Sequence, residues 1–379
     1  FIYGYFYWLL ACLQFIPPLP LLLYFIVAVF FFLFFILWTW GSCAARSCSS
    51  PAFPASDITA LEVVDLWKKY FQEKGVTEPD HSSQYIMAHL LGAKTIESVE
   101  QERLTEILSQ EKIEQMWRLC LRRLSRMPVQ YVIEEWDFRD LTLKMRPPVF
   151  IPRPETEELV ELMLNDLQMK DGKEDVQRRC LEVGCGSGAI SLSLLHGLPQ
   201  LKAFALDQSQ EAVDLTRENA LRLGLQDRLQ LYHMDIMKDA ETVLRLCGPV
   251  SAVVSNPPYL FSEDMDSLEP EILRFEDHAA LDGGKDGLEV IKQVLILAPQ
   301  ILLNHGRVYL EVDPRHPPLI RRWVEANVEE LHYVETKHDI SGRFVQKTSQ
   351  PRYHLGIITH PYSLVNLEIV FLFYIHCFI

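Results

Sequence analysis

The chain has 379 residues, 49% of them hydrophobic, which is enough apolar material for two domains with cores of their own. Its net charge of −15 argues against naked DNA as a substrate and suits a basic protein partner, because nucleic-acid enzymes usually present a basic surface. The eight cysteines are scattered, none forms a C-x2-C pair and no histidine cluster completes a zinc site, so no metal is expected.

Residues 1–55 and 361–379 are apolar and unlike the middle of the chain. The run from Leu19 to Trp40 has 22 residues without a charge, which is long enough to cross a bilayer as a helix. A membrane anchor is therefore one interpretation. We favour the other, that both extensions are translated non-coding sequence, because they have no linker of their own and the chain opens with Phe1. Residues 41–56 faintly resemble the remnant of a transit peptide.

Residues 56–127 have the pattern of a small helical domain. Ser56-Asp57 can cap a first helix that Gly75 ends. Further helices are predicted over 82–91, 102–109 and 111–126. Apolar residues that recur at helical spacing in the first helix are interpreted as core: Leu61, Val64, Trp67, Tyr70 and Phe71.

Residues 128–150 are predicted to form a hairpin linker. Tyr131-Val132-Ile133 and Leu141-Thr142-Leu143 have the alternation of strands, and the linker leads to Phe150. Acidic residues then open a helix at Glu155, where they favour the helix dipole and need no catalytic role. Arg153 is either a contact for a cofactor carboxylate or part of a structural ion pair.

A glycine-rich loop follows the predicted strand 179–183 and precedes a helix over 189–196. It reads Gly184-Cys185-Gly186-Ser187-Gly188, and its alternating glycines let backbone approach a ligand at a helix N-terminus. The spacing differs from the dinucleotide fingerprint, but the loop alone leaves a nicotinamide cofactor open. Cys185 fills a position that needs a small residue. A nucleophilic role for it would need a basic neighbour.

Two acidic residues mark the ends of the next predicted strands, 202–206 and 228–233. Asp207 lies about twenty residues past the loop, which suits an acceptor for ribose hydroxyls. Asp235 is placed to border an adenine.

The motif Ser255-Asn256-Pro257-Pro258-Tyr259 ends the apolar run 249–254. The side-chain oxygen of Asn256 can accept one N–H of a planar NH2 group, and the carbonyl of Pro257 can accept the other. The two prolines hold that carbonyl rigidly, and Tyr259 can lie flat against the planar group. This arrangement suits methylation of an amide or amino nitrogen. The plainer alternative is a turn that ends a strand.

The carboxyl-terminal half continues the alternation of helices and strands. We expect a helix over 288–303, a strand over 307–312 and a helix over 318–328. Segments 331–337 and 343–347 are expected as antiparallel closing strands, with a further strand over 353–358. The alternation predicts an α/β fold with a mostly parallel, doubly wound sheet, whose ligands bind at the carboxyl ends of the strands.

Motifs spread over residues 57–347 resemble the HemK/PrmC family of protein-(glutamine-N5) methyltransferases, and look most like its mitochondrial member in animals. The motifs are long: Pro128-Val129-Gln130-Tyr131, Ile151-Pro152-Arg153-Pro154-Glu155-Thr156-Glu157, the glycine-rich loop, the Asn256 motif, Ala279-Ala280-Leu281-Asp282-Gly283-Gly284 and Leu310-Glu311-Val312-Asp313-Pro314-Arg315-His316-Pro317. The resemblance implies a class I (Rossmann-like) methyltransferase domain over 151–360. It also implies that the helical domain recruits the substrate.

The family's activity is transfer of a methyl group from S-adenosylmethionine to the glutamine of a Gly-Gly-Gln segment in a class I peptide-chain release factor, here in mitochondria. Carried over to this sequence, Asn256, Pro257 and Tyr259 are the catalytic group. Phe150 and Pro258 join them around the substrate, and the cofactor is bordered by Gly184, Cys185, Gly186, Ser187, Gly188, Asp207, Asp235, Ile236 and Asn256. Ile236 lacks the aromatic ring that the family places there, and Glu134 stands where the family has a turn glycine.

Two other functions stay open. An N6-adenine methyltransferase would use the same acceptor geometry, but it would need base flipping, a basic groove and a target-recognition module. A membrane-tethered, cofactor-binding scaffold would explain the apolar ends, although the intact Asn256 and Asp207 speak against it. The acidic segment 263–276 is either a solvated face or a lid whose carboxylates meet a basic release factor.

Overall fold

The computed structural model describes residues 51, 57–169, 178–338 and 367–373, of which 333–338 and 367–373 are described by their backbone only. The described residues from Asp57 onward belong to one compact unit. Among the described residues, no helix is both long and apolar enough to cross a membrane. The run from Leu19 to Trp40, which could be a membrane anchor, lies outside the described residues.

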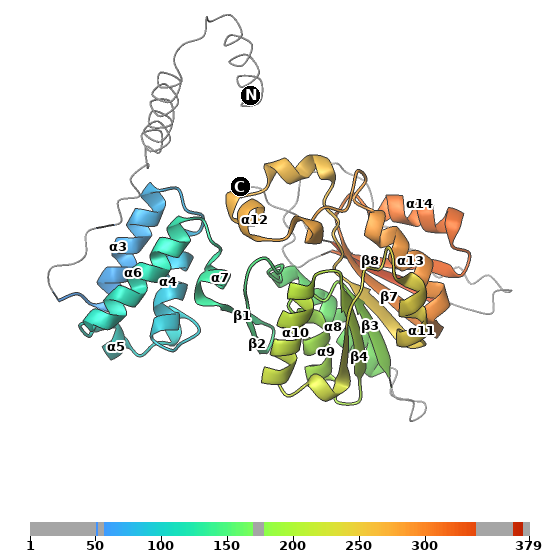
Figure 1. Cartoon of the computed structure of the whole chain (residues 1–379), viewed down its shortest axis with the longest axis horizontal. Coiled ribbons are helices and arrows are strands. Elements are labelled where there is room, and N and C mark those ends of the chain that lie inside the picture. The colour runs from blue at the N-terminus through green and yellow to red at the C-terminus, as the bar shows by residue number, and fades with distance from the viewer. Residues whose placement is uncertain (1–50, 52–56, 170–177, 339–366, 374–379) are drawn as a thin grey trace, which may run out of the picture. The chain divides into compact units, whose positions relative to one another are not determined.

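The amino-terminal part is helical, as expected (Figure 1). Trp67, at 0% exposure, packs edge-on against Trp117 with ring centroids 5.1 Å apart, and both rings belong to one apolar core. The first helix begins later than Ser56-Asp57 predicted, because Thr59 and Glu62 form a reciprocal capping box. Leu61 is 38% exposed and does not belong to the core. The helices are α3 (Ala60–Glu73), α4 (Pro79–Leu90), α5 (Gln101–Thr105), α6 (Gln110–Leu124) and α7 (Val129–Ile133).

The linker differs from the prediction in its first half. Tyr131-Val132-Ile133 belongs to the short helix α7 and not to a strand, since all three side chains are buried, whereas alternation would have exposed the middle one. Strands β1 (Glu135–Phe138) and β2 (Leu141–Lys144) form the hairpin. Between helix and hairpin, Glu134 has φ +62°, in the left-handed region. This backbone conformation explains why a glycine was expected there.

The carboxyl-terminal part is a parallel sheet in the order β5-β4-β3-β6-β7-β9-β8. Side chains on β3 alternate between two cores, Leu181 and Val183 on one face and Cys180 on the other. Helices α8 and α9 cover the Cys180 face, and α11, α13 and α14 cover the Leu181 face (Figure 1). The bounds are α8 (Pro154–Met169), β3 (Arg179–Val183), α9 (Ala189–Gly197), β4 (Lys202–Asp207), α10 (Gln210–Arg222), β5 (Leu229–His233), α11 (Ala240–Cys247), β6 (Val250–Ser255), α12 (Pro270–Phe275), α13 (Glu289–Ile301), β7 (Leu302–Val312), α14 (Pro317–Asn327), β8 (Leu331–His338) and β9 (Leu367–Phe373).

The α/β fold with a parallel, doubly wound sheet is confirmed, but the closing strands were predicted wrongly. The strand expected over 331–337 is β8, and it runs parallel to β9 instead of antiparallel to a neighbour. Its partner comes from Leu367–Phe373, inside the segment expected as an apolar tail, and that seven-residue run is rich in β-branched and aromatic residues, as strands are. Segments 343–347 and 353–358, the other expected strands, lie outside the described residues.

Candidate active site

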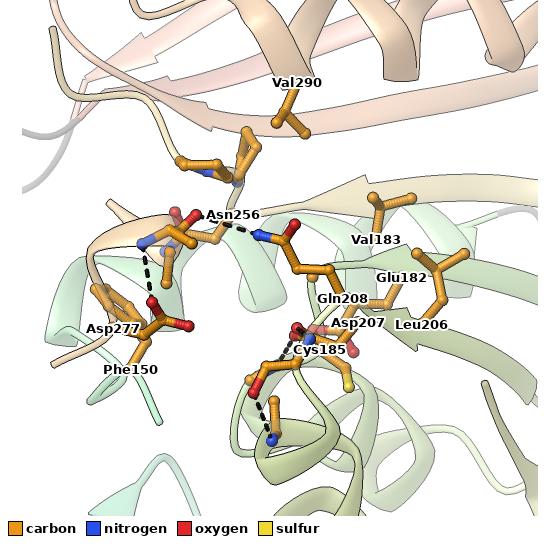
Figure 2. A pocket seen from close by; sticks show the side chains of 18 of the residues that line it. Phe150, Glu182, Val183, Cys185, Leu206, Asp207, Gln208, Asn256, Asp277 and Val290 are labelled. Atoms are coloured by element: carbon orange, nitrogen blue, oxygen red, sulfur yellow. Dashed lines mark hydrogen bonds between the residues drawn. The ribbon is translucent and has the colours of Figure 1, made fainter. Parts of the chain in front are cut away.

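A cleft of about 1020 Å³ opens at the carboxyl ends of β3, β4, β5 and β6. The chain leaves β3 toward β4 on one side and returns to β6 on the other, and this reversal of strand order is where parallel sheets bind ligands. Figure 2 shows Cys185, Asp207 and Gln208 on one side of the cleft and Phe150 and Asp277 on the other. All the cofactor residues predicted from the sequence line this cleft except Gly188.

The glycine-rich loop turns sharply from β3 into α9. Gly186 has φ +53° and an added Cβ would meet nothing within 4 Å, so the backbone is open to the cleft at this residue. Gly188 has φ +86°, and a Cβ there would lie 2.8 Å from a methyl of Leu192. Gly188 therefore supports the loop from behind without lining the cleft.

Cys185 is an inert thiol. It is 3% exposed, and burial, reinforced by the carboxylates of Asp207 and Glu182, raises the pKa of its thiol well above the usual value. The hydroxyl of Thr216 lies 3.5 Å from its Sγ. The basic neighbour that a nucleophile would need does not contact it among the described residues, so we assign Cys185 no role in chemistry.

Asp207 is held between two loops. One carboxylate oxygen accepts the backbone N–H of Gly186 at 2.9 Å, and the other accepts that of Ser209 at 2.9 Å. Burial raises the pKa of this carboxyl despite those two bonds. A carboxylate has about four acceptor sites, so both oxygens can still accept hydroxyl groups from the cleft.

Gln208 was not predicted, and it extends across the mouth of the cleft. Its Nε2 donates to the carbonyl of Ala279 at 3.4 Å, joining the end of β4 to the segment 277–280 (Figure 2). Asp277 fixes that segment, since its side chain accepts the N–H of Ala279 at 2.9 Å. The alanine-rich motif Ala279-Ala280 was visible in the sequence, but nothing in its composition indicates that it closes a cleft.

Asp235 and Ile236 lie in the wall of the cleft, where the third strand ends. Asp235 is engaged elsewhere: its side chain accepts the N–H of Met237 at 2.9 Å and pairs with Lys238 at 2.7 Å. Lys238 lowers the pKa of this carboxyl. Ile236 is 5% exposed, whereas Met237 is 50% exposed and also lines the cleft. Aliphatic side chains thus line the cleft where the family resemblance led us to expect an aromatic ring.

Asn256 and Pro257 present two acceptors at the rim of the cleft. Nδ2 of Asn256 donates to the hydroxyl of Thr156 at 3.1 Å, which leaves its Oδ1 on the other side of the amide. Among the residues that the structure describes, no donor contacts this Oδ1 or the carbonyl of Pro257. The pair that the sequence predicted is thus unengaged and next to the cleft.

Tyr259 lies beside the cleft in an adjoining hollow of about 370 Å³, which Phe150, Asn256 and Pro257 also line. It is 8% exposed, and its hydroxyl donates to Glu311 at 3.4 Å. A side chain that passes Asn256 would enter this hollow, which Tyr259 and Phe150 both line. Pro258, by contrast, lines the larger cleft.

The segment that follows Ala280 is hydrogen-bonded to the backbone at the end of the Asn256 motif. Leu260 N–H donates to Leu281 at 2.9 Å, and Gly283 N–H donates back to Leu260 at 2.8 Å. A Cβ on Gly283 would lie 2.7 Å from the carbonyl oxygen of Pro258, so only glycine permits this approach.

Arg153 belongs to a structural ion pair. It contacts Glu276 at 2.7 Å and lies over the ring of Phe150 at 4.7 Å. Glu276 also accepts the N–H of Ile151 at 3.1 Å, which fixes the backbone that carries Phe150. In the acidic segment 263–276, Glu271 and Glu276 are therefore buried and paired, and neither is a solvated charge that meets a partner.

The same two parts of the chain match known protein families. Residues 62–133 match the model of the PrmC N-terminal domain, and residues 140–310 match that of the methyltransferase small domain. The MTRF1L release factor glutamine methyltransferase of Homo sapiens is 46% identical over 303 residues, which cover 79% of this chain and 90% of that protein.

The chain belongs to the release factor glutamine methyltransferases.

A bacterial member, from Deinococcus radiodurans, is 32% identical over 246 residues, which cover 65% of this chain and 83% of that protein. A solved SAM-dependent methyltransferase from Agrobacterium tumefaciens aligns with a TM-score of 0.32 at 16% identity, over 46% of this chain and 50% of that one. Within the described residues, no group of three or more His, Cys, Asp or Glu could hold a metal ion.

Besides Gln208, sequence reasoning missed three polar residues around the site of this release factor glutamine methyltransferase. Thr156 and Glu311 were quoted as parts of motifs without a role, and both are buried beside Asn256. Glu182 also lines the cleft and accepts the N–H of Ser191 at 3.1 Å. A charged residue inside an apolar strand, as in 179–183 and 307–312, is the signal that could have found both glutamates.

Proposed function

We propose that this protein methylates the side-chain amide nitrogen of the glutamine in a Gly-Gly-Gln segment of a class I peptide-chain release factor, and that it does so in mitochondria. The family supports the reaction, and the name of the human relative, a release factor glutamine methyltransferase, supports the substrate. The observation that carries the proposal is the unengaged acceptor pair, Asn256 Oδ1 and the Pro257 carbonyl, at the rim of the cleft.

The residues of the cleft fit S-adenosylmethionine. Asp207 would accept the ribose hydroxyls with the lone pairs that Gly186 and Ser209 leave open, and the backbone at Gly186 faces free space. Ile236 and Met237 would flank the adenine, with Asp235 at its edge. When bound, the cofactor supplies a methyl group on a positively charged sulfur.

Methylation of an amide nitrogen requires an oriented lone pair, because that lone pair is delocalised into the carbonyl. Asn256 and Pro257 would each accept one N–H of the glutamine amide and so direct the nitrogen toward the cleft. The same two acceptors would stabilise the positive charge that develops on nitrogen. Phe150 and Tyr259 would contact the side chain in the hollow that they line, and Pro258 would lie in the wall of the adjoining cleft.

The test offers the full-length protein three substrates with labelled cofactor: a mitochondrial release factor, the same factor with its Gly-Gly-Gln glutamine replaced by alanine, and duplex DNA. Label should enter the first alone. Label in DNA alone would move the assignment to an adenine methyltransferase, which the net charge of −15 disfavours. Label in the alanine-substituted factor would reject the amide as the target. Fractionation of cells that express the chain then tests the compartment.

A further inference from the structure

A chain of hydrogen bonds extends from Asn256 into the core. Nδ2 of Asn256 donates to Thr156 Oγ1 at 3.1 Å, and that hydroxyl donates to Glu311 Oε2 at 2.7 Å. The other carboxylate oxygen accepts the hydroxyl of Tyr259 at 3.4 Å. Thr156 is 2% exposed on the first turn of α8, and Glu311 is 0% exposed on β7. Three elements thus meet behind the proposed substrate site.

Glu311, at the buried end of this chain of hydrogen bonds, sets which group donates and which accepts in each bond. When Glu311 is ionised, its carboxylate only accepts hydrogen bonds, so the single hydroxyl proton of Thr156 is committed to Glu311. The Thr156 oxygen can then only accept from Asn256, and this selects the NH2 end of the amide. The oxygen of Asn256 is left facing the other way, without a donor among the described residues.

We infer that Glu311 and Thr156 are positioning residues for methyl transfer, which together hold the amide of Asn256 with its oxygen toward the substrate nitrogen. This inference rests on the proposed function. Without the relay, the amide can turn over and present NH2 to the substrate NH2, which places donor against donor. The acceptor would then be lost while the Asn256 side chain remained in place.

The carboxylate of Glu311 is not explained by a contribution to stability. Among the described residues, its hydrogen-bond partners are two hydroxyl groups and no cation is paired with it, and burying an unpaired charge is costly. Burial raises the pKa of Glu311 to about 7; the nearby Glu155 also raises it, whereas Thr156, Tyr259 and Arg153 lower it. A glutamine of the same shape would remove the charge. Groups that are kept at a cost to stability are typical of functional sites.

The variants that separate function from structure are Glu311→Gln, Thr156→Val and Thr156→Ser. Glutamine can donate to Thr156, which frees the hydroxyl proton to bind Asn256 Oδ1 and reverses the relay. Valine keeps the shape of threonine but has no hydroxyl, and serine keeps the hydroxyl. Asn165→Ala, on the exposed surface of the same helix α8, is the control variant, and it should keep the activity of the wild type.

We expect Glu311→Gln and Thr156→Val each to lower kcat on a release factor by about 10- to 100-fold, with cofactor affinity by calorimetry within about twofold of the wild type. Thr156→Ser should restore most of the activity. The kcat of the double variant Glu311→Gln, Thr156→Val should be no lower than that of either single variant, because both changes remove the same orientation of the Asn256 amide. The melting temperature of Glu311→Gln at pH 8 should equal or exceed that of the wild type.

The outcomes distinguish the two proposals. If the wild type does not methylate the release factor, the proposed function fails. If it does, and Thr156→Val keeps the wild-type kcat, the positioning role is overturned. Losses that multiply in the double variant would also overturn it, because Glu311 would then act by another route. Should Thr156→Val fail to fold, the comparison of Glu311→Gln with Thr156→Ser decides.

Discussion

Asn256 is the residue on which the proposed chemistry depends most directly. Replacing it with alanine removes one of two aligned acceptors, so we expect turnover to fall by at least ~100-fold while cofactor binding changes little. Single-turnover rates with labelled cofactor measure the first quantity and calorimetry the second. An unchanged rate would exclude Asn256 from the reaction.

Glu182 allows a prediction about stability and pH. Burial raises the pKa of its carboxyl to about 8, with a further contribution from Asp207. The native state therefore holds a proton that the unfolded chain has already released above its ordinary pKa of 4.5. Stability from this group is complete below about pH 4.5, declines as pH rises, and is lost above about pH 8.

We expect Glu182→Gln to remove this decline, because the amide mimics the neutral acid and still accepts the N–H of Ser191. The gain in free energy of unfolding should be on the order of 5 kcal/mol at pH 9 and near zero at pH 4. Denaturant titrations at several pH values measure it, with the exposed Glu241→Gln as the control. A gain that is equal at all pH values would contradict the assignment.

At the scale of the element, sequence periodicity predicted most of the parallel sheet and its helices. The strand at 250–255 and the helix at 289–301 fall close to their expected bounds because each carries a continuous apolar pattern. The pattern failed where tertiary contacts decide. Residues 131–133 read as a strand but form a helical turn with all three side chains buried, and Leu61 keeps the helical spacing of the core but faces outward.

The candidate site was predictable to a similar extent. Its motif residues were found because glycine, proline and asparagine have strong local preferences at turns. Three other site residues were not predicted, because their roles depend on partners far away in the sequence. Gln208 contacts a residue 71 positions away, Thr156 contacts Asn256 100 positions away, and Glu311 contacts Thr156 155 positions away. Local spacing carries no information about such contacts.

Glu134 gives a prediction for the turn between α7 and β1. A non-glycine residue at φ +62° is strained by roughly 1 kcal/mol. Glu134→Gly removes this strain, and Glu134→Ala keeps it; both lose the 3.3 Å contact with Arg122. We therefore expect the glycine variant to be more stable than the alanine variant by ~1 kcal/mol in chemical denaturation. Equal stabilities would show that the turn is not strained.

At the scale of the whole molecule, one buried ion pair links the helical domain to the segment that follows the Asn256 motif. Arg123 of α6 contacts Glu271 of α12 at 3.1 Å, and Arg126 contacts the same oxygen at 3.2 Å. Burial opposes ionisation of Glu271, but the two arginines prevail and lower its pKa. Arg123 is 3% exposed and also contacts Ser82 and Thr77, so the link is continuous with the helical core.

Breaking this pair should destabilise the protein as a whole. We expect Glu271→Ala to lower the free energy of unfolding by ~3 kcal/mol, because the charge of Arg123 stays buried without its partner. Thermal and denaturant unfolding measure the loss, and the exposed Glu263→Gln on the same segment should change it by less than ~0.5 kcal/mol. Equal effects of the two substitutions would refute a special role for the pair.

The position of Glu271 also limits how this protein can be dissected. A fragment that begins at the hairpin β1–β2 would contain the complete cleft, yet it would expose the α12 carboxylate where two guanidinium groups had neutralised it. Low turnover of such a fragment could then come from the loss of this ion pair, which positions α12, and would not by itself demonstrate a loss of substrate recruitment. A truncated protein that also carries Glu271→Gln would remove this unpaired carboxylate and so test substrate recruitment more directly.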